Sequence, residues 1–149
     1  MKYDDASWHY GGNFPTDVPR EAGGTHIGMF VAWCMLNGLG GEIHVAELPD
    51  ILERLRKKEK TPGSWFLGAC DEKFTDEDLS DEGNEFAKAY YEMSYGGYVD
   101  DYTAVVGGGY PTIYHVPDNW ETYERLAPVI NRRFKQWKRP RKWWQIWKS

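Results

Sequence analysis

One nearly unbroken apolar run restricts the fold of this chain more than any other feature. It extends from Ile27 to Leu36, with Thr25 in front of it and Gly38 just after it. A threonine at the start of such a run is typical of a helix N-cap, and a glycine at its end is typical of a C-terminus. A helix that is apolar on all sides has no face suited to water. The run therefore predicts a buried central helix over residues 25–37.

Other segments carry weaker helical signals. In residues 48–60 the apolar side chains recur at the spacing of one helix face, and Pro62 opens a short helical segment behind that one. The predicted helices beyond the central one span residues 48–60, 61–69, 80–95 and 119–138. Pro128 lies within the last of these and is expected to kink or restart it. Residues 112–116 are β-branched and aromatic and predict a strand.

These signals predict a mainly α protein, a single compact helical domain around a buried central helix, with room for a small β-hairpin or short sheet. A length of 149 residues fits one domain. We expect this globular domain to cover residues 1–138. A basic, tryptophan-rich C-terminal tail follows over residues 139–149, and it is expected to pack on the domain or on a second copy, forming a homodimer.

Composition and motifs exclude several classes of protein. No run of about 18 apolar residues is present, and the first residues lack the apolar core of a secretory signal. Cys34 and Cys70 form no CxxC pair, which favours reduced thiols in the cytoplasm. We therefore expect a cytoplasmic protein with no membrane partner, no nucleic-acid partner and no cofactor.

The charged residues are strongly separated along the chain. Residues 71–101 hold eleven acids against two lysines, whereas residues 125–149 hold nine bases and no acid. Closely spaced carboxylates repel one another, and a bound cation or a basic partner reduces this repulsion. Calcium is disfavoured because the segment lacks the spacing of an EF-hand loop, so a solvated face and a partner-binding surface remain. The candidate partner-binding residues are Asp71, Glu72, Asp76, Glu77, Asp78, Asp81, Glu82, Glu85, Asp100 and Asp101.

Residues suited to catalysis are few. No phosphate-binding loop, nucleophile elbow or zinc-protease motif occurs, and we expect neither a bound metal nor an enzyme. Cys34 lies in an apolar run and the acids after Cys70 would raise its pKa, so neither thiol is a favoured nucleophile. One candidate pocket remains near the N-terminus, and it would require these side chains to converge: Asp4, Asp5, Trp8, His9 and His26.

Several stretches together resemble a family of small bacterial proteins without an assigned activity, which look like immunity proteins of polymorphic or contact-delivered toxins. The matching stretches are Tyr3–Tyr10, Phe14–Pro15, Thr25–Phe30, Ala32–Trp33, Cys70–Leu79, Gly83–Asn84, Phe86–Ala87, Tyr90–Tyr91 and Tyr114–Val116 with Trp120. The resemblance implies no catalytic residue. It implies a binding protein whose partner is a cognate toxin.

Charge separation is compatible with that role, because charged surfaces accelerate association and aromatic side chains supply affinity. The leading hypothesis is therefore a toxin-neutralising protein, whose acidic and aromatic surface enters a basic active-site cleft of the toxin. Two alternatives remain open. One is a general interaction or scaffold domain, and the other is a small enzyme that uses the neighbourhood of His9 and His26.

Overall fold

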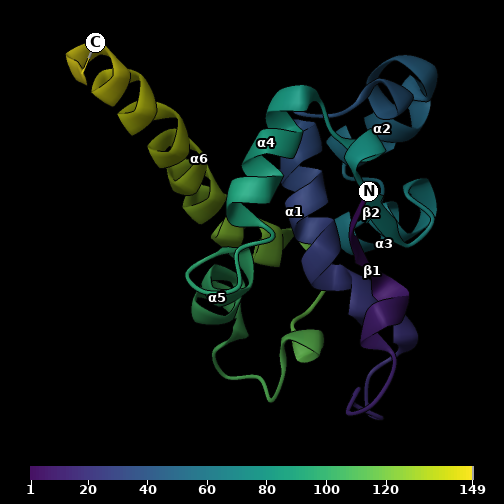
Figure 1. The fold of residues 1–149 in the computed structure, drawn as a ribbon. Coiled ribbons are helices and arrows are strands. Elements are labelled where there is room, and N and C mark those ends of the chain that lie inside the picture. The colour runs from purple at the N-terminus through teal and green to yellow at the C-terminus, as the bar shows by residue number, and fades with distance from the viewer. Residues whose placement is uncertain (149) are drawn as a thin grey trace.

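Helix α1 (Thr25–Leu36) runs through the centre of the molecule (Figure 1). The structure is a computed structural model that describes residues 1–148, and the side chains of residues 1–139. Every residue of α1 from Thr25 to Met35 is buried. The predicted central helix is thus confirmed, and its all-round apolar character is explained by neighbours on every side.

Helices dominate the elements around α1. The longer helices are α2 (Pro49–Arg56), α3 (Pro62–Ala69), α4 (Asp81–Tyr90), α5 (Tyr98–Tyr102) and α6 (Trp120–Lys148). Short 3₁₀-helices are η1 (Ala6–His9), η2 (Arg20–Gly24), η4 (Asp76–Asp78) and η6 (Ile113–His115), and short π-helices are η3 (Ile43–Glu47) and η5 (Thr103–Gly107). The predicted fold class, a mainly α compact domain, is confirmed.

A two-stranded antiparallel sheet joins the N-terminus to the middle of the chain. Strand β1 (Lys2–Asp5) pairs with β2 (Lys73–Thr75), and Asp4 lies opposite Phe74. The expected short sheet therefore exists, but the strand predicted over residues 112–116 is wrong. That segment forms η6, whose N-cap Thr112 accepts a hydrogen bond from the amide of Tyr114. Without a partner strand, this local cap determines the conformation.

The closest helix contact lies between α1 and α3. A Cβ atom on Gly28 would lie 2.7 Å from the Cα atom of Gly63. The N-terminus of α3 is fixed by Asp118, whose carboxylate accepts hydrogen bonds from the amides of Gly63 (2.8 Å) and Ser64 (3.1 Å). A carboxylate at this end of a helix satisfies free N–H groups and complements the dipole.

Several predicted helix boundaries differ from the structure. Thr25 is the first residue of α1 and Gly24 is its N-cap, because η2 leads directly into the helix. Helix α2 ends at Arg56, since Lys58 adopts a positive φ of 58°. Helix α4 ends at Tyr90, five residues before the predicted end. The predicted start of α3 is confirmed, because Pro62 is its first residue and the N-cap Thr61 accepts a hydrogen bond from the amide of Ser64.

Helix α6 completes the core and then leaves the body of the molecule (Figure 1). Leu126 and Ile130 are fully buried, and Asn131 accepts a hydrogen bond from the indole of Trp33 at 2.7 Å. The helix is continuous through Pro128, so the expected restart there does not occur. Its backbone extends into the tail over residues 139–149, but the side chains of residues 140–149 lie outside the described part. The proposed packing of that tail therefore stays a prediction.

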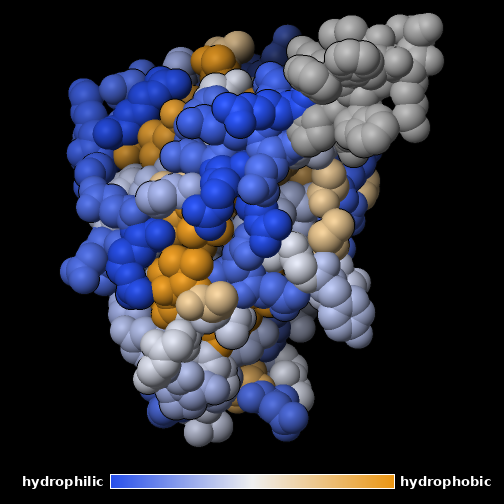
Figure 2. Space-filling model, turned by 90° about the vertical axis from the view of Figure 1, so that its left-hand side faces the viewer, coloured by the Kyte–Doolittle hydropathy of each residue, from blue (hydrophilic) through white to orange (hydrophobic). Residues whose placement is uncertain are grey.

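The face formed by α4, α5 and α6 is mixed in polarity. Figure 2 shows a band of apolar side chains on this face, bordered by hydrophilic residues. Met93 and Val99 contribute exposed apolar surface in this region of the chain. Among the described residues, no helix combines the length and apolar character needed to cross a bilayer.

Candidate functional site

Asp4 is the centre of a polar cluster at the edge of the core. It lies on β1, beside a position where the pairing with β2 is irregular. Its Oδ1 atom accepts hydrogen bonds from the amide of Asp5 (2.8 Å) and from Nε2 of His9 (2.8 Å), and its Oδ2 atom accepts one from the hydroxyl of Tyr91 (2.6 Å). This carboxylate is therefore fixed from three directions.

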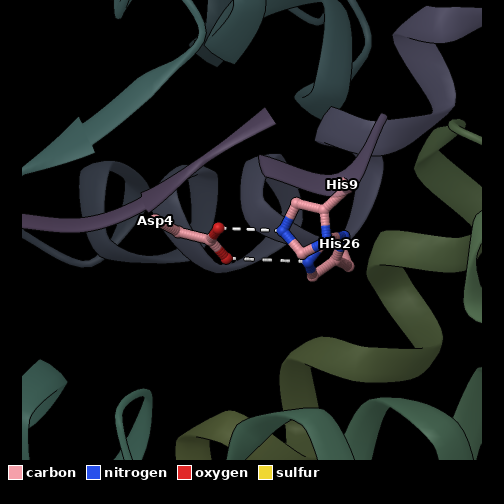
Figure 3. A group of neighbouring side chains, drawn as sticks. All are labelled: Asp4, His9 and His26. Carbon is pink, nitrogen blue, oxygen red and sulfur yellow. Dashed lines mark hydrogen bonds and ion pairs between the residues drawn. The ribbon is translucent and has the colours of Figure 1, made fainter. Parts of the chain in front are cut away.

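Two histidines face this carboxylate (Figure 3). His9 comes from η1 and His26 from the first turn of α1. Nε2 of His9 lies 2.8 Å from one oxygen of Asp4, and Nε2 of His26 lies 3.7 Å from the other. The two imidazole rings meet edge to face, with centroids 4.6 Å apart. Both ring edges thus point at the same carboxylate.

His26 is unusually poor in hydrogen bonds for a buried histidine. Its side chain is 2% exposed, and its Nδ1 atom has no hydrogen-bond partner among the described residues. Its Nε2 atom is 3.7 Å from Asp4, which is longer than a hydrogen bond. Burying polar atoms without partners costs about 1–3 kcal/mol each. Such a site is therefore suited to an additional atom that the histidine would bind.

The protonation states favour a ligand role for these groups. Burial lowers the pKa of His26, against the opposing effect of the Asp4 carboxylate, so the imidazole is neutral near pH 7. Burial alone would raise the pKa of Asp4, but the imidazoles of His26 and His9 and the Tyr91 hydroxyl hold it well below its usual range. A neutral imidazole and an ionised carboxylate are the forms that coordinate metals.

Tyrosines from distant segments hold the histidines in place. The hydroxyl of Tyr114 lies 2.7 Å from Nδ1 of His9. It donates to Nδ1 when Nε2–H donates to Asp4, and it accepts from Nδ1–H in the other tautomer, in which the Nε2 lone pair is free for a metal. A second partner of this kind orients a metal-binding histidine ring. The hydroxyl of Tyr98 donates to the backbone carbonyl of His26 at 2.5 Å and so fixes its main chain.

A metal ion fits the donor set of Asp4, His9 and His26. One ligand atom from each residue lies within 4.8 Å of the other two. Two imidazoles and one carboxylate form a common set for zinc and for non-haem iron, and they leave coordination positions open. No metal was expected because the chain has no motif with the spacing of metal ligands, and motif spacing does not show which side chains converge in the fold.

The candidate pocket predicted from sequence is brought together only in part. Asp4, His9 and His26 meet, but Asp5 and Trp8 do not join them. The side chain of Asp5 pairs with Lys2 at 2.9 Å and accepts a hydrogen bond from the amide of Ser7, and Trp8 is 58% exposed. A groove of about 240 Å³ lies nearby and is lined in part by Thr25 and Tyr114.

The acidic segment does not form one free surface. Asp78 is buried against His44, so it is not available to a partner in this structure. Six others have internal partners: Asp71 with Lys73, Glu72 with Tyr10, Asp76 with the N-terminal amine, Glu82 with Lys138, Asp100 with the amide of Gly96, and Asp101 with Arg133. The remaining candidates, Glu77, Asp81 and Glu85, are exposed.

Sequence reasoning missed several members of these polar clusters. Tyr91 and Tyr114 lie far from Asp4 in the chain, and nothing in their local pattern marks them as partners of a carboxylate. His44 was not singled out, although it contacts Asp78 at 2.8 Å and lies 3.8 Å from the thiol of Cys70. The pKa of Cys70 is raised, as expected, but the causes are burial and Asp78 instead of the two acids that follow it.

Comparison with known proteins places most of the chain in one family. Residues 2–116 match a family described as a domain of unknown function, DUF7832. No curated protein and no solved structure matches the chain. The matched range contains Asp4, His9, His26 and both supporting tyrosines. The family description names no activity, so the resemblance to immunity proteins stays a prediction.

Proposed function

This chain belongs to the DUF7832 family, whose description names no activity, and from the geometry of its own site we propose that it binds a divalent transition-metal ion at Asp4, His9 and His26. The observation that carries this proposal is the convergence of three ligand atoms within 4.8 Å. The buried His26, which lacks a hydrogen bond of ordinary length, gives independent support.

The ligands suit zinc, and they suit iron(II) as a second choice. Structural zinc sites have four protein ligands, whereas sites with three protein ligands keep a position for water or substrate. Such an ion polarises a bound carbonyl or makes a bound water acidic. His9 is the most exposed of the three ligands, at 21% of its side chain, so the open position is expected on its side. The prediction that the chain is not an enzyme stays open to test.

Metal titration of the full-length protein tests this proposal. After dialysis against a chelator, the protein is titrated with Zn²⁺ in a calorimeter, and bound metal is measured after gel filtration. We expect the Asp4→Asn and His9→Asn variants to lose one bound zinc ion and at least about tenfold in affinity, because second-shell changes alone already cost about 10–100-fold.

His115→Asn is the matched control. His115 also pairs with a carboxylate, that of Asp17 at 2.9 Å, but it lies outside the cluster. This variant should bind zinc as the unaltered protein does. If neither Asp4→Asn nor His9→Asn changes the zinc content of a folded protein, the cluster is a hydrogen-bonded structural unit and the proposal is wrong.

Neutralisation of a cognate toxin is the second candidate function. The observation in its favour is the group of exposed acids Glu77, Asp81 and Glu85, which have no cation partner among the described interactions. These three acids follow one another over η4 and α4, so they are able to act together on a basic partner. The family resemblance implies the partner's kind, a cognate bacterial toxin, and the exposed acids favour a toxin with a basic cleft.

Co-expression with a toxin encoded beside this gene tests the second candidate. A complex should form faster at low salt and weaken when Glu77, Asp81 and Glu85 are changed to Gln, Asn and Gln. Asp78 is not substituted, because it is buried and its substitution could unfold the protein, which would also abolish binding. The matched control neutralises Glu47, Glu59 and Glu121, exposed acids elsewhere. If no complex forms, or if both triple variants behave alike, this candidate is excluded.

A further inference from the structure

A second group of metal-ligating side chains lies away from the first one. We propose that His44, Cys70 and Asp78 form a separate site for a thiophilic divalent ion, with Zn²⁺ as the expected occupant. Nε2 of His44 lies 2.8 Å from Oδ1 of Asp78 and 3.8 Å from Sγ of Cys70. The three ligand atoms lie within 4.8 Å of one another.

The arrangement at His44 brings two potential ligands to one nitrogen. The thiol and the carboxylate both approach Nε2. One imidazole nitrogen has either one proton or one lone pair, so without an ion Nε2–H donates to Asp78, and the thiol is left to bond to the same carboxylate. In a catalytic triad the nucleophile and the carboxylate contact opposite nitrogens of the histidine. At His44 both groups approach one nitrogen, so the three residues do not form a triad. An ion between the three atoms would bind all of them at once.

Distances support an ion of the size of zinc. With zinc bonds of about 2.0–2.1 Å to nitrogen and oxygen and about 2.3 Å to sulfur, tetrahedral ligands lie about 3.3–3.6 Å apart. The separation of 3.8 Å between Cys70 and His44 is close to this range. The separation of 2.8 Å between His44 and Asp78 is that of a hydrogen bond, so these two must move apart by about half an ångström.

The backbone around this site is fixed by contacts between distant segments. His44 belongs to η3, Cys70 is the C-cap of α3, and Asp78 ends η4. The amide of Gly41 donates to the carbonyl of Asp78 at 2.9 Å, which places η3 beside η4. A site built from three separately anchored segments is pre-organised, which lowers the cost of binding.

Neighbouring groups orient two of the ligands. Oδ2 of Asp78 accepts a hydrogen bond from the amide of Thr75 at 2.8 Å, which leaves Oδ1 directed at His44. The ring of His44 packs against Trp65, with centroids 5.5 Å apart. His44 and Asp78 are buried, and Cys70 is partly buried. Access for an ion is therefore expected from the side of Cys70.

Cobalt(II) is the probe that separates this site from the one at Asp4. The full-length, chelator-treated protein is titrated with Co²⁺ while its near-ultraviolet absorption is recorded. A thiolate bound to cobalt gives an intense charge-transfer band, whereas a site of two histidines and one carboxylate has no thiolate to give one. In Asp4→Asn, which lacks the first site, we expect the band to saturate at about one cobalt ion per chain, because one ion binds the single cluster that holds a thiol.

Matched variants assign the band to one cysteine. Cys70→Ser should abolish it, whereas Cys34→Ala, which alters the other thiol, and Asp4→Asn should leave it intact. A band that is absent from the unaltered protein overturns the proposal, as does one that disappears in Cys34→Ala. If Asp4→Asn loses zinc but retains the cobalt band, the site at His44, Cys70 and Asp78 is supported as a separate one. If zinc binding depends on Asp4 but no cobalt band appears, only the site at Asp4, His9 and His26 is supported.

A measurement on the unaltered protein covers the case in which Cys70→Ser does not fold. Alkylation of Cys70 by iodoacetamide, followed by peptide mass analysis, should slow several-fold when Zn²⁺ is added. The same zinc concentration should not change the alkylation of Cys34. Equal rates at Cys70 with and without zinc would contradict a zinc-bound thiolate.

Discussion

At the scale of single residues, the sequence identified the histidines of the site but not the side chains that surround them. The sequence identified Asp4, His9 and His26 as a possible group because they lie near one another in the chain. It did not identify the tyrosines, because Tyr91 and Tyr114 approach from segments that follow 87 and 105 residues after their partners Asp4 and His9. Such distant pairs leave no local pattern, so only the fold reveals them.

The ring of His26, whose Nδ1 has no hydrogen-bond partner among the described residues, leads to a prediction on the metal-free protein. His26→Leu keeps about the same volume and removes two polar atoms without hydrogen bonds of ordinary length. We expect it to change the free energy of unfolding by less than about 1 kcal/mol, because removing buried polar groups without partners is nearly neutral or stabilising. Chemical denaturation in the presence of a chelator measures this change.

Met29→Ala is the comparison for that experiment. Met29 is fully buried on the same helix, and its truncation should cost about 2–5 kcal/mol. If His26→Leu costs as much, then His26 has strong partners in the metal-free protein, and its proposed role as an unoccupied ligand is wrong.

At the scale of elements, sequence patterns predicted which helices form but not where each one ends. The apolar run gave α1, and the threonine–proline pair gave the start of α3, because both signals are local. The ends of α2 and α4 depend on turns after Arg56 and Tyr90 that the apolar spacing does not encode. The strand expected over residues 112–116 failed because a strand also requires a partner.

Close packing of α1 on α3 predicts opposite effects for two glycine substitutions. In Gly28→Ala the new methyl group would meet backbone atoms of Pro62 and Gly63 at 2.7–2.8 Å, so we expect a loss of about 1–3 kcal/mol. In Gly68→Ala nothing lies within 4 Å of the new methyl group, so we expect a gain of up to about 1 kcal/mol. Urea denaturation of both variants tests the prediction, and equal effects would contradict the described packing.

The contact between α5 and α6 predicts a pH-dependent contribution to stability. Asp101 accepts two hydrogen bonds from the guanidinium of Arg133, at 2.8 and 2.9 Å. Burial would raise the pKa of Asp101, but Arg133 and the hydroxyl of Tyr90 outweigh it and lower the pKa. Because the folded pKa is depressed, this stabilisation is present above the unfolded pKa of about 3.9 and is lost as the pH falls through the folded value.

Asp101→Asn should therefore destabilise the protein by about 1 kcal/mol at pH 7, a modest value because Arg133 is partly exposed to solvent. The difference from the unaltered protein should shrink below about pH 4, where Asp101 of the unaltered protein becomes protonated. Glu85→Gln, an exposed acid without such a pair, should show no comparable effect. A pH-independent loss in Asp101→Asn would contradict the assigned ion pair.

At the scale of the whole molecule, the charge separation seen in the sequence is reduced by internal pairing. Links such as Glu82 to Lys138 and Asp101 to Arg133 join the acidic and the basic segments within one chain. Counting charges along the sequence could not reveal this, because it does not show which acids meet which bases. The family match ends at residue 116, yet α6 beyond it supplies fully buried core residues.

This arrangement predicts the effect of removing the tail. In a chain that ends at Arg139, the described contacts of α6 with the core remain, including the hydrogen bond from Trp33 to Asn131. We expect its free energy of unfolding to stay within about 1 kcal/mol of the full-length value. Light scattering on the same samples shows whether residues 140–149 mediate the predicted homodimer. A large loss of stability would show that the tail belongs to the domain.

The distances in sequence that separate the site residues also determine when the site can form. Asp4 and His9 leave the ribosome first, but Tyr91 and Tyr114, which hold them in place, are among the later residues. Asp118, which fixes the start of α3, is later still. A nascent chain therefore holds His9 and His26 without their supports until these later segments have been synthesised. If the proposed site binds a metal, capture follows the collapse of the chain and cannot guide its early steps.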